Sequence, residues 1–323
     1  MITLLAAMVG FAGSARADAR DGRLVRWEGH DRYQVSARVS NSFPVGVARM
    51  FVASGEVFTD ALSGAPIAGR DHAPILLVRH DSVPSTVRDA IVRLQPRSIV
   101  VLGGEATISS AVYADLSTLT TGPTTRWSGP DRYAASAAMS AAAFAPGVTR
   151  AYVASGTAFP DALAGAPAAG STPGPILLTV PDAVPASIDA ELKRLAPKEI
   201  VVLGGTATIS SAVEQALAAD TTGAVVRWSG ADRFATSAAI SQSGFPGGAD
   251  TVFISSGWVF ADALSGAPVA GARHAPTLLV ELDGIPDTVA AELRRLHPRT
   301  IVVVGGWASV SDETFGQLSD YLD

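Results

Sequence analysis

Cysteine is absent from this chain of 323 residues, and histidine occurs only five times. Without cysteine the sequence can form no disulfide, no thiol nucleophile and no cysteine-ligated metal site. No histidine position recurs in all three of the repeats set out below. A hydrolytic site common to the repeats would therefore lack its usual general base. We expect no cofactor and no metal site.

Positive charge is in deficit, because 24 lysines and arginines face 30 aspartates and glutamates and give a formal net charge of −6. This balance argues against a nucleic-acid binder that relies on a general basic surface. No nucleic-acid partner is expected, and any anionic partner must be held by local groups. The apolar share of 48% is enough to build hydrophobic cores, so disorder is not expected.

Long apolar runs are also missing beyond the N-terminus, where no stretch reaches the roughly 18 uncharged apolar residues of a membrane span. The run from Ile2 to Gly13 is too short to cross a bilayer and precedes the small-residue pattern Ala15-Arg16-Ala17. This order predicts a signal peptide over residues 1–17 and a secreted mature chain. No basic residue precedes the run, and a buried N-terminal helix is the alternative.

Three blocks of sequence each occur three times and in the same order. The first block, Arg-Trp-x-Gly-x-Asp-Arg followed by an aromatic residue, spans 26–33, 126–133 and 227–234. The second, Ser-Gly-x-x-Phe-x-Asp-Ala-Leu-x-Gly-Ala-Pro, spans 54–66, 155–167 and 256–268. The third is a β-branched run that ends in two glycines, and its first glycine follows the second-block aspartate by 43 residues in every copy.

The repeat length of about a hundred residues exceeds the roughly 20–50 residues of solenoid repeats. We therefore expect each copy to be a small domain, with boundaries at 18–121, 122–222 and 223–323. Small domains with apolar flanks pack together, which favours a compact pseudo-threefold triangle within a monomer.

Hydrophobic periodicity in the first copy predicts alternating strands and helices. The predicted strands are 24–27, 49–53, 74–78 and 98–102, and the predicted helices are 31–41, 60–69, 85–94 and 109–116. Continuous apolar runs such as Ile99–Leu102 are typical of strands that are covered on both faces. We therefore predict an α/β fold with parallel, doubly wound sheets.

These motifs resemble the cell-wall-binding repeat type 2 family, found as three tandem copies in surface proteins of Gram-positive bacteria. The resemblance covers nearly all of the chain after residue 17. It implies three Rossmann-like or toprim-like units in a triangle that attach non-covalently to anionic wall polymers. The family's Pro-Ile-Leu-Leu-Thr pattern keeps its threonine only at Thr179, and the usual proline before the second-block aspartate occurs only as Pro160. The middle copy is thus nearest to the family pattern.

Polar residues of the repeats follow predicted strands, and ligands bind along the carboxyl edge of open parallel sheets. Arginine suits bidentate contact with phosphate or carboxylate, and amides at a strand–glycine–helix turn can hold an anion. Glycine also merely permits such a turn. The candidate ligand-binding residues are Arg32, Arg132, Arg233, Asp60, Asp161, Asp262, Gly103, Gly104, Gly204, Gly205, Gly305, Gly306 and Thr179.

Several of the repeated residues have a structural alternative. Asp31, Asp131 and Asp232 precede predicted helices and suit the role of N-cap. The first-block arginines either contact ligand or pair with the second-block aspartates, within one repeat or between repeats. The first-block tryptophans either stack on sugars or pack in the core, and core packing is favoured.

The leading hypothesis is a non-catalytic module that binds an anionic cell-wall polymer, such as a teichoic-acid-like or other secondary wall polysaccharide, and anchors the protein at the cell surface. Three weak sites on one polymer would gain from effective concentration. One alternative is a secreted hydrolase that uses Ser54 and Asp60 or their equivalents. Another is a self-assembling surface-layer or adhesin subunit.

Overall fold

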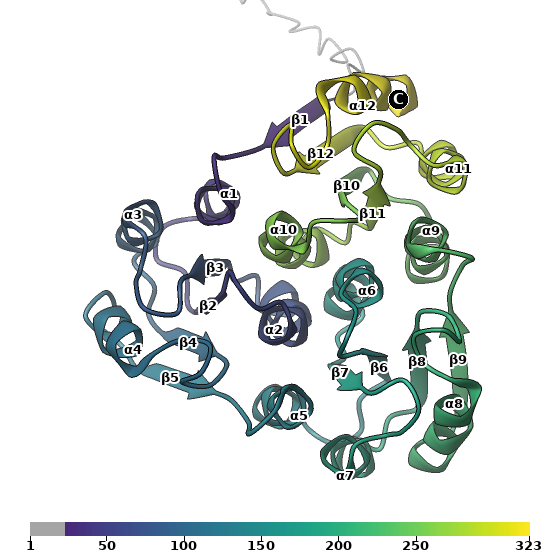
Figure 1. The fold of residues 1–323 in the computed structure, drawn as a ribbon, viewed down its shortest axis with the longest axis horizontal. Coiled ribbons are helices and arrows are strands. Elements are labelled where there is room, and N and C mark those ends of the chain that lie inside the picture. The colour runs from purple at the N-terminus through teal and green to yellow at the C-terminus, as the bar shows by residue number, and fades with distance from the viewer. Residues whose placement is uncertain (1–22) are drawn as a thin grey trace, which may run out of the picture.

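The computed structural model describes residues 23–323, so the predicted signal peptide lies outside the described residues. It shows three α/β units around a central axis, with one four-stranded parallel sheet in each (Figure 1). The predicted fold class is confirmed. No helix among residues 23–323 is long and apolar enough to cross a membrane.

Strands and helices alternate throughout, within about two residues of the predicted bounds. The first repeat contains β1 (Arg23–Trp27), α1 (Arg32–Ser40), β2 (Met50–Ser54), α2 (Thr59–Arg70), β3 (Ile75–Val78), α3 (Ser85–Leu94), β4 (Ile99–Leu102) and α4 (Ser110–Ser117). The second contains β5 (Thr124–Trp127), α5 (Arg132–Ala143), β6 (Arg150–Ser155), α6 (Pro160–Ser171), β7 (Ile176–Thr179), α7 (Ala186–Leu195), β8 (Glu199–Leu203) and α8 (Ser211–Leu217). The third contains β9 (Ala224–Trp228), α9 (Arg233–Gly244), β10 (Thr251–Ser256), α10 (Phe260–Ala272), β11 (Thr277–Val280), α11 (Asp287–Leu296), β12 (Thr300–Val304) and α12 (Asp312–Gln317).

Each sheet takes one edge strand from the next repeat. The strand orders are β3-β2-β4-β5, β7-β6-β8-β9 and, closing the ring, β11-β10-β12-β1. Strand β1 therefore pairs with the far end of the chain, and Trp27 lies opposite Val304 in the register. The sheets thus cross the boundaries between the sequence repeats and tie each repeat to its neighbour.

The first-block tryptophans end these shared strands and pack against aromatic residues of the same sheet. Trp27 contacts Phe253 edge-to-face with ring centroids 5.7 Å apart, and Trp127 contacts Phe51 in the same way at 5.8 Å. Trp228 packs on Tyr152 at 5.9 Å. Such edge-to-face pairs are a preferred aromatic arrangement, so the predicted core role of the tryptophans is confirmed.

Helices α2, α6 and α10 carry the small-residue block and meet on the central axis (Figure 1). Their closest approach is at Gly69, Gly170 and Gly271, where a Cβ atom on Gly170 would lie 3.3 Å from the Cα of Gly271 and 3.5 Å from that of Gly69. Near the other ends of these helices three phenylalanines meet edge-to-face or tilted, with ring centroids 5.4–6.1 Å apart: Phe58, Phe159 and Phe260. The small-residue block is therefore explained by helix packing.

Replacing Gly170 with valine tests this packing. We expect Gly170→Val to lower the free energy of unfolding by about 1–3 kcal/mol because the extra methyl groups overpack the axis. Gly316→Val is the matched control, since a Cβ on this helical glycine would meet no atom within 4 Å. Valine favours helix over glycine, so the control should lose no stability. Urea unfolding of both variants measures the difference, and an unchanged midpoint for Gly170→Val would contradict the packing argument.

Candidate functional site

The carboxyl edges of the sheets meet the next repeat at three junctions. Because β5 lies beside β4, the loop that follows β5 is placed over the turn that follows β4 and over the start of α2. We define each junction by the aspartate of one repeat and the arginine of the next. The 1–2 junction holds Asp60 and Arg132, the 2–3 junction holds Asp161 and Arg233, and the 3–1 junction holds Asp262 and Arg32.

The junction aspartates lie in the first turn of α2, α6 and α10 and are largely removed from solvent. Asp161 is 7% exposed, and its Oδ2 accepts a hydrogen bond of 3.3 Å from the Thr208 hydroxyl. Asp60 accepts one from Thr107 at 3.4 Å, and Asp262 accepts one from Ser309 at 2.8 Å.

Burial raises the pKa of each of these three carboxyl groups, because it disfavours the charged form. The hydroxyl donor and the positive charge of the next repeat's arginine oppose the rise in pKa only in part. The electrostatic partner of each aspartate is therefore the arginine of the neighbouring repeat.

The first glycine of each third block makes room for its aspartate. Gly103 and Gly204 have φ values of +101° and +103°, which side chains rarely allow. A Cβ on Gly204 would lie 2.1 Å from Oδ2 of Asp161, and Gly305 at φ +130° shows the same approach to Asp262 at 3.0 Å.

The backbone amides of these first glycines are already engaged. The amide of Gly103 donates to the carbonyl of Trp127 at 2.8 Å, and the amide of Gly204 donates to Trp228 at 3.0 Å. The third copy repeats this bond from Gly305 to Trp27. The second glycines, Gly104, Gly205 and Gly306, are less crowded, since a Cβ atom added there would meet no atom closer than 3.7 Å.

The junction arginines hold their own repeat and retain unused donors. Nη1 of Arg132 donates to the carbonyl of Gly156 at 2.7 Å, and Arg233 donates to Gly257 at the same distance. Arg32 donates likewise to Gly55. No arginine–aspartate pair at the junctions comes within 4 Å among residues 23–323, so the predicted direct ion pair is not formed. A guanidinium has five N–H donors, so each group keeps donors for a ligand.

The remaining repeated polar residues have structural roles. Asp131 accepts hydrogen bonds from the amides of Tyr133 and Ala134, and Asp232 caps its helix in the same way. Asp31 accepts from the amide of Gln34, so the N-cap prediction is confirmed. Thr179 does not reach a junction. It is fully buried, and its hydroxyl donates to the carbonyl of Ala183 at 2.8 Å.

The serines considered for hydrolysis are also buried. Ser54 has no exposed surface, and its Oγ accepts from the amide of Glu56 at 3.1 Å. Ser155 and Ser256 hold the corresponding turns in the same way. No group of three or more metal-ligating side chains occurs within residues 23–323.

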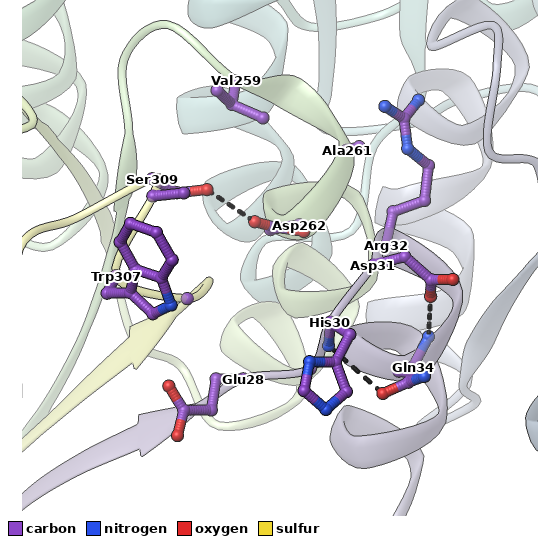
Figure 2. A pocket seen from close by; sticks show the side chains of 13 residues that line it. Glu28, His30, Asp31, Arg32, Gln34, Val259, Ala261, Asp262, Trp307 and Ser309 are labelled. Carbon is purple, nitrogen blue, oxygen red and sulfur yellow. Dashed lines mark hydrogen bonds between the residues drawn. The ribbon is translucent and has the colours of Figure 1, made fainter.

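Two junctions contain pockets of unequal size. The pocket at the 2–3 junction has a volume of about 390 Å³ and is lined by Phe159, Asp161, Gly205 and Arg233 among others. The pocket at the 3–1 junction has a volume of about 740 Å³, and Figure 2 shows Asp262, Asp31 and Arg32 around it.

Sequence reasoning missed three side chains that are specific to the 3–1 junction. Glu28, His30 and Trp307 line this pocket (Figure 2), and Trp307 is 72% exposed. The other copies carry smaller or different side chains at these positions. A search for residues shared by all repeats passes over them, although two tryptophans at positions where the other copies have none, Trp258 and Trp307, were visible in the sequence.

Comparison with known proteins identifies the class of this fold and site. The family described as cell wall binding domain 2 (CWB2) matches residues 26–113, 126–214 and 227–315. The chain belongs to this family and carries three tandem cell wall binding domains.

Two curated relatives of this chain are longer than it is. The chain is 30% identical to the amidase enhancer of Bacillus subtilis (strain 168) over 295 residues, which cover 91% of this chain and 40% of that protein. It is 24% identical to the N-acetylmuramoyl-L-alanine amidase LytC of the same strain over 300 residues, covering 93% and 59%.

Two solved structures share the fold. Cwp6 from Clostridium difficile has a TM-score of 0.86 and 22% identity, with 94% of this chain and 48% of that chain covered. Cwp8 from Clostridium difficile has a TM-score of 0.82 and 23% identity, with 93% and 52% covered. The chain therefore spans about half the length of the structures that it matches.

The contact between glycine and aspartate can be tested by a double-mutant cycle. We expect Gly204→Ala to cost about 1–3 kcal/mol of stability, because alanine is strained at positive φ and its Cβ meets the carboxylate. Adding Asp161→Ala should recover part of this loss, with a coupling energy of about 0.5–3 kcal/mol. Gly205→Ala is the control and should be nearly neutral. If the two substitutions lower the free energy of unfolding additively in urea, the carboxylate of Asp161 is not the reason that position 204 requires glycine.

The raised pKa of Asp161 predicts a pH-dependent effect of Asp161→Asn. A carboxyl group whose pKa is higher in the folded state costs stability as pH rises from its unfolded value through its folded value. The amide of asparagine escapes this cost and can still accept from Thr208. The variant should match the parent near pH 4 and exceed it increasingly toward pH 7 in thermal unfolding, whereas exposed Asp182→Asn should not. A gain that shrinks as pH rises would refute the burial argument.

Proposed function

We propose that this chain binds an anionic polymer of a Gram-positive cell wall non-covalently and so anchors a secreted protein at the cell surface. Membership of the cell wall binding domain 2 family supports the wall as the target. The ligand-binding elements are proposed to be the three junctions, and the repeats are proposed to act without catalysis.

The observation that carries this proposal is the partly engaged arginine at each junction. Arg132 and Arg233 each spend one N–H on a backbone carbonyl of their own repeat and have no acidic partner within 4 Å among residues 23–323. Phosphate and carboxylate groups accept forked hydrogen bonds from guanidinium. Each junction thus offers a cation that is fixed in position by its first hydrogen bond and open to an anion with the rest.

The buried aspartates favour this role because their pKa values are raised. A rise in pKa eases the loss of the negative charge beside the arginine, and only the protonated carboxyl group can donate a hydrogen bond to an anionic oxygen. Three such sites on one molecule can engage successive units of a polymer, so their weak affinities combine through effective concentration.

A hydrolase is the less favoured alternative. Nucleophilic serine catalysis needs an accessible hydroxyl beside a base, whereas Ser54 is fully buried and holds a turn. His30 lines the 3–1 pocket, but the corresponding positions of the other copies are Pro130 and Ala231. A self-assembling surface-layer or adhesin subunit remains an outcome of the test below.

Sedimentation with purified Gram-positive walls tests the proposal. The mature chain should co-sediment with intact walls at low salt, and binding should fall as salt rises because the contacts are ionic. Mild acid treatment that strips the anionic polymer should abolish binding. Equal binding to stripped walls, or sedimentation without walls, would sink the proposal, and the second result would indicate self-assembly.

Substitution of two junction arginines locates the contacts. Arg132→Ala with Arg233→Ala should weaken wall binding at least about tenfold, since each charge-assisted hydrogen bond contributes about 1.5–3 kcal/mol. Arg97→Ala, which removes an exposed arginine away from the junctions, is the control and should bind normally. Thermal unfolding shows whether the Ala variant still folds. Arg132→Lys with Arg233→Lys keeps the two charges but removes the guanidinium forks. Full wall binding by a folded Ala variant would exclude the junction arginines as contacts.

A further inference from the structure

Three arginines line a further pocket, which runs along β1 of the third sheet from its amino end. Arg23 begins β1, Arg38 lies in the last turn of α1, and Arg273 follows the last residue of α10. Their shared pocket has a volume of about 280 Å³ and includes Trp27 and Asn41 in its lining. Figure 1 shows α1 and α10 on the inner side of β1 and β12. The C-termini of helices in parallel α/β units lie at the amino edge of the sheet, away from the junctions.

Among residues 23–323, the three guanidinium groups have no partner of opposite charge. Arg23, Arg38 and Arg273 form no ion pair and no side-chain hydrogen bond with any residue in the described range 23–323. Burial and the charge of Arg23 lower the pKa of Arg273, so the like charges are close enough to act on one another. Arg273 also lies over the Trp27 ring, 5.5 Å from its centroid.

The equivalent places in the other two sheets are neutralised by acidic residues. Arg49 lies 5.9 Å from the centroid of the Trp127 ring and pairs with Asp71 at 2.8 Å. Arg150 lies 5.2 Å from the centroid of the Trp228 ring and pairs with Glu199. Neither of the other sheets carries the three arginines. At the corresponding positions the sheet of β4 and β5 has Pro123, Ala138 and Asp71. The sheet of β8 and β9 has Ala224, Ala239 and Thr172. The unpaired cluster is thus specific to the closure between the third and first repeats.

Helix dipoles explain only part of this accumulation of positive charge. The C-termini of α1 and α10 both lie here, and each is equivalent to about half a negative charge that favours a nearby cation. Three full positive charges exceed the sum of these two helix ends. The pocket therefore keeps a local positive charge on a chain whose net charge is −6.

We propose that Arg23, Arg38 and Arg273 form a binding site for a phosphate group, carried as a phosphomonoester or phosphodiester. A phosphate offers tetrahedrally arranged oxygens that can accept from guanidinium forks on several sides, whereas a carboxylate offers two oxygens in one plane. The side-chain amide of Asn41 adds an N–H donor, and the Trp27 ring forms an apolar wall for the attached alcohol. The site goes beyond the proposed function, because it lies at the other edge of the sheet.

Calorimetric titration of the mature chain at low salt tests the site with three probes: inorganic phosphate, glycerol 3-phosphate and galacturonate. Both phosphates should bind saturably, and glycerol 3-phosphate should bind more tightly if the site takes an ester rather than free phosphate. Arg38→Ala with Arg273→Ala should weaken phosphate binding at least tenfold, and the double Lys variant should retain more of it. Absent binding, equal binding by the Ala variant or tighter binding of galacturonate would overturn the assignment.

Two matched variants make the titration specific. Arg97→Ala should bind phosphate like the parent. In a chain that already carries Arg132→Ala with Arg233→Ala, the remaining phosphate binding should still fall at least tenfold when Arg38→Ala with Arg273→Ala is added, so this site and the junctions can fail separately. Asp18 and Asp21 precede Arg23 in the sequence and could compete for the arginines. Replacing both with asparagine should leave phosphate binding unchanged or tighter, and loss of binding in that variant would count against the proposal.

Discussion

The pairing of each repeat's first strand with the sheet of the preceding repeat is the constraint on which the rest of this structure depends. It places the Gly-x-Asp-Arg loop over the end of a foreign sheet, so that Arg233 faces Asp161 across a repeat boundary. No single repeat contains a complete junction. A unit cut at the sequence boundaries would lose an edge strand and half of its site, which explains why the copies occur together in a closed ring.

Two close approaches then fix the geometry inside that ring. At the axis, Gly170 and its equivalents let three helices meet almost backbone to backbone. At the carboxyl edge, Gly204 lets the Asp161 carboxylate approach a strand end. The second approach removes a charge from water without a direct cationic partner, which disfavours ionisation. An apolar residue in place of Asp161 would avoid the electrostatic cost of burying a carboxylate. The presence of the aspartate is therefore better explained by a role in function than by a contribution to stability. The same burial keeps the neighbouring guanidinium available to an external anion.

Local chemistry could be predicted from the sequence, while partnership between repeats could not. The βα order, the capping role of Asp131 and the core role of Trp127 each follow from residues close in sequence or from burial patterns. The strand that ends in Trp127 pairs with the sheet of the preceding repeat. Hydrophobic periodicity does not predict this pairing, because it depends on long-range packing. Thr179 was placed in the site by resemblance, yet its buried hydroxyl is bound to its own turn. Trp307 was missed because it breaks the repeat pattern.

Closure of the ring by the two ends of the described chain makes the sheet of β1 and β12 different from the other two at both edges. Its carboxyl edge gains Glu28 and Trp307, and its amino edge gains the unpaired arginines beside Trp27. At physiological ionic strength exposed charges are screened over about 8 Å. If an anionic polymer binds as proposed, the net charge of −6 would act weakly on it at the surface, while an arginine cluster would act on it directly. The proposed function is therefore compatible with an acidic protein, because gathered cations would act on an anionic polymer at short range.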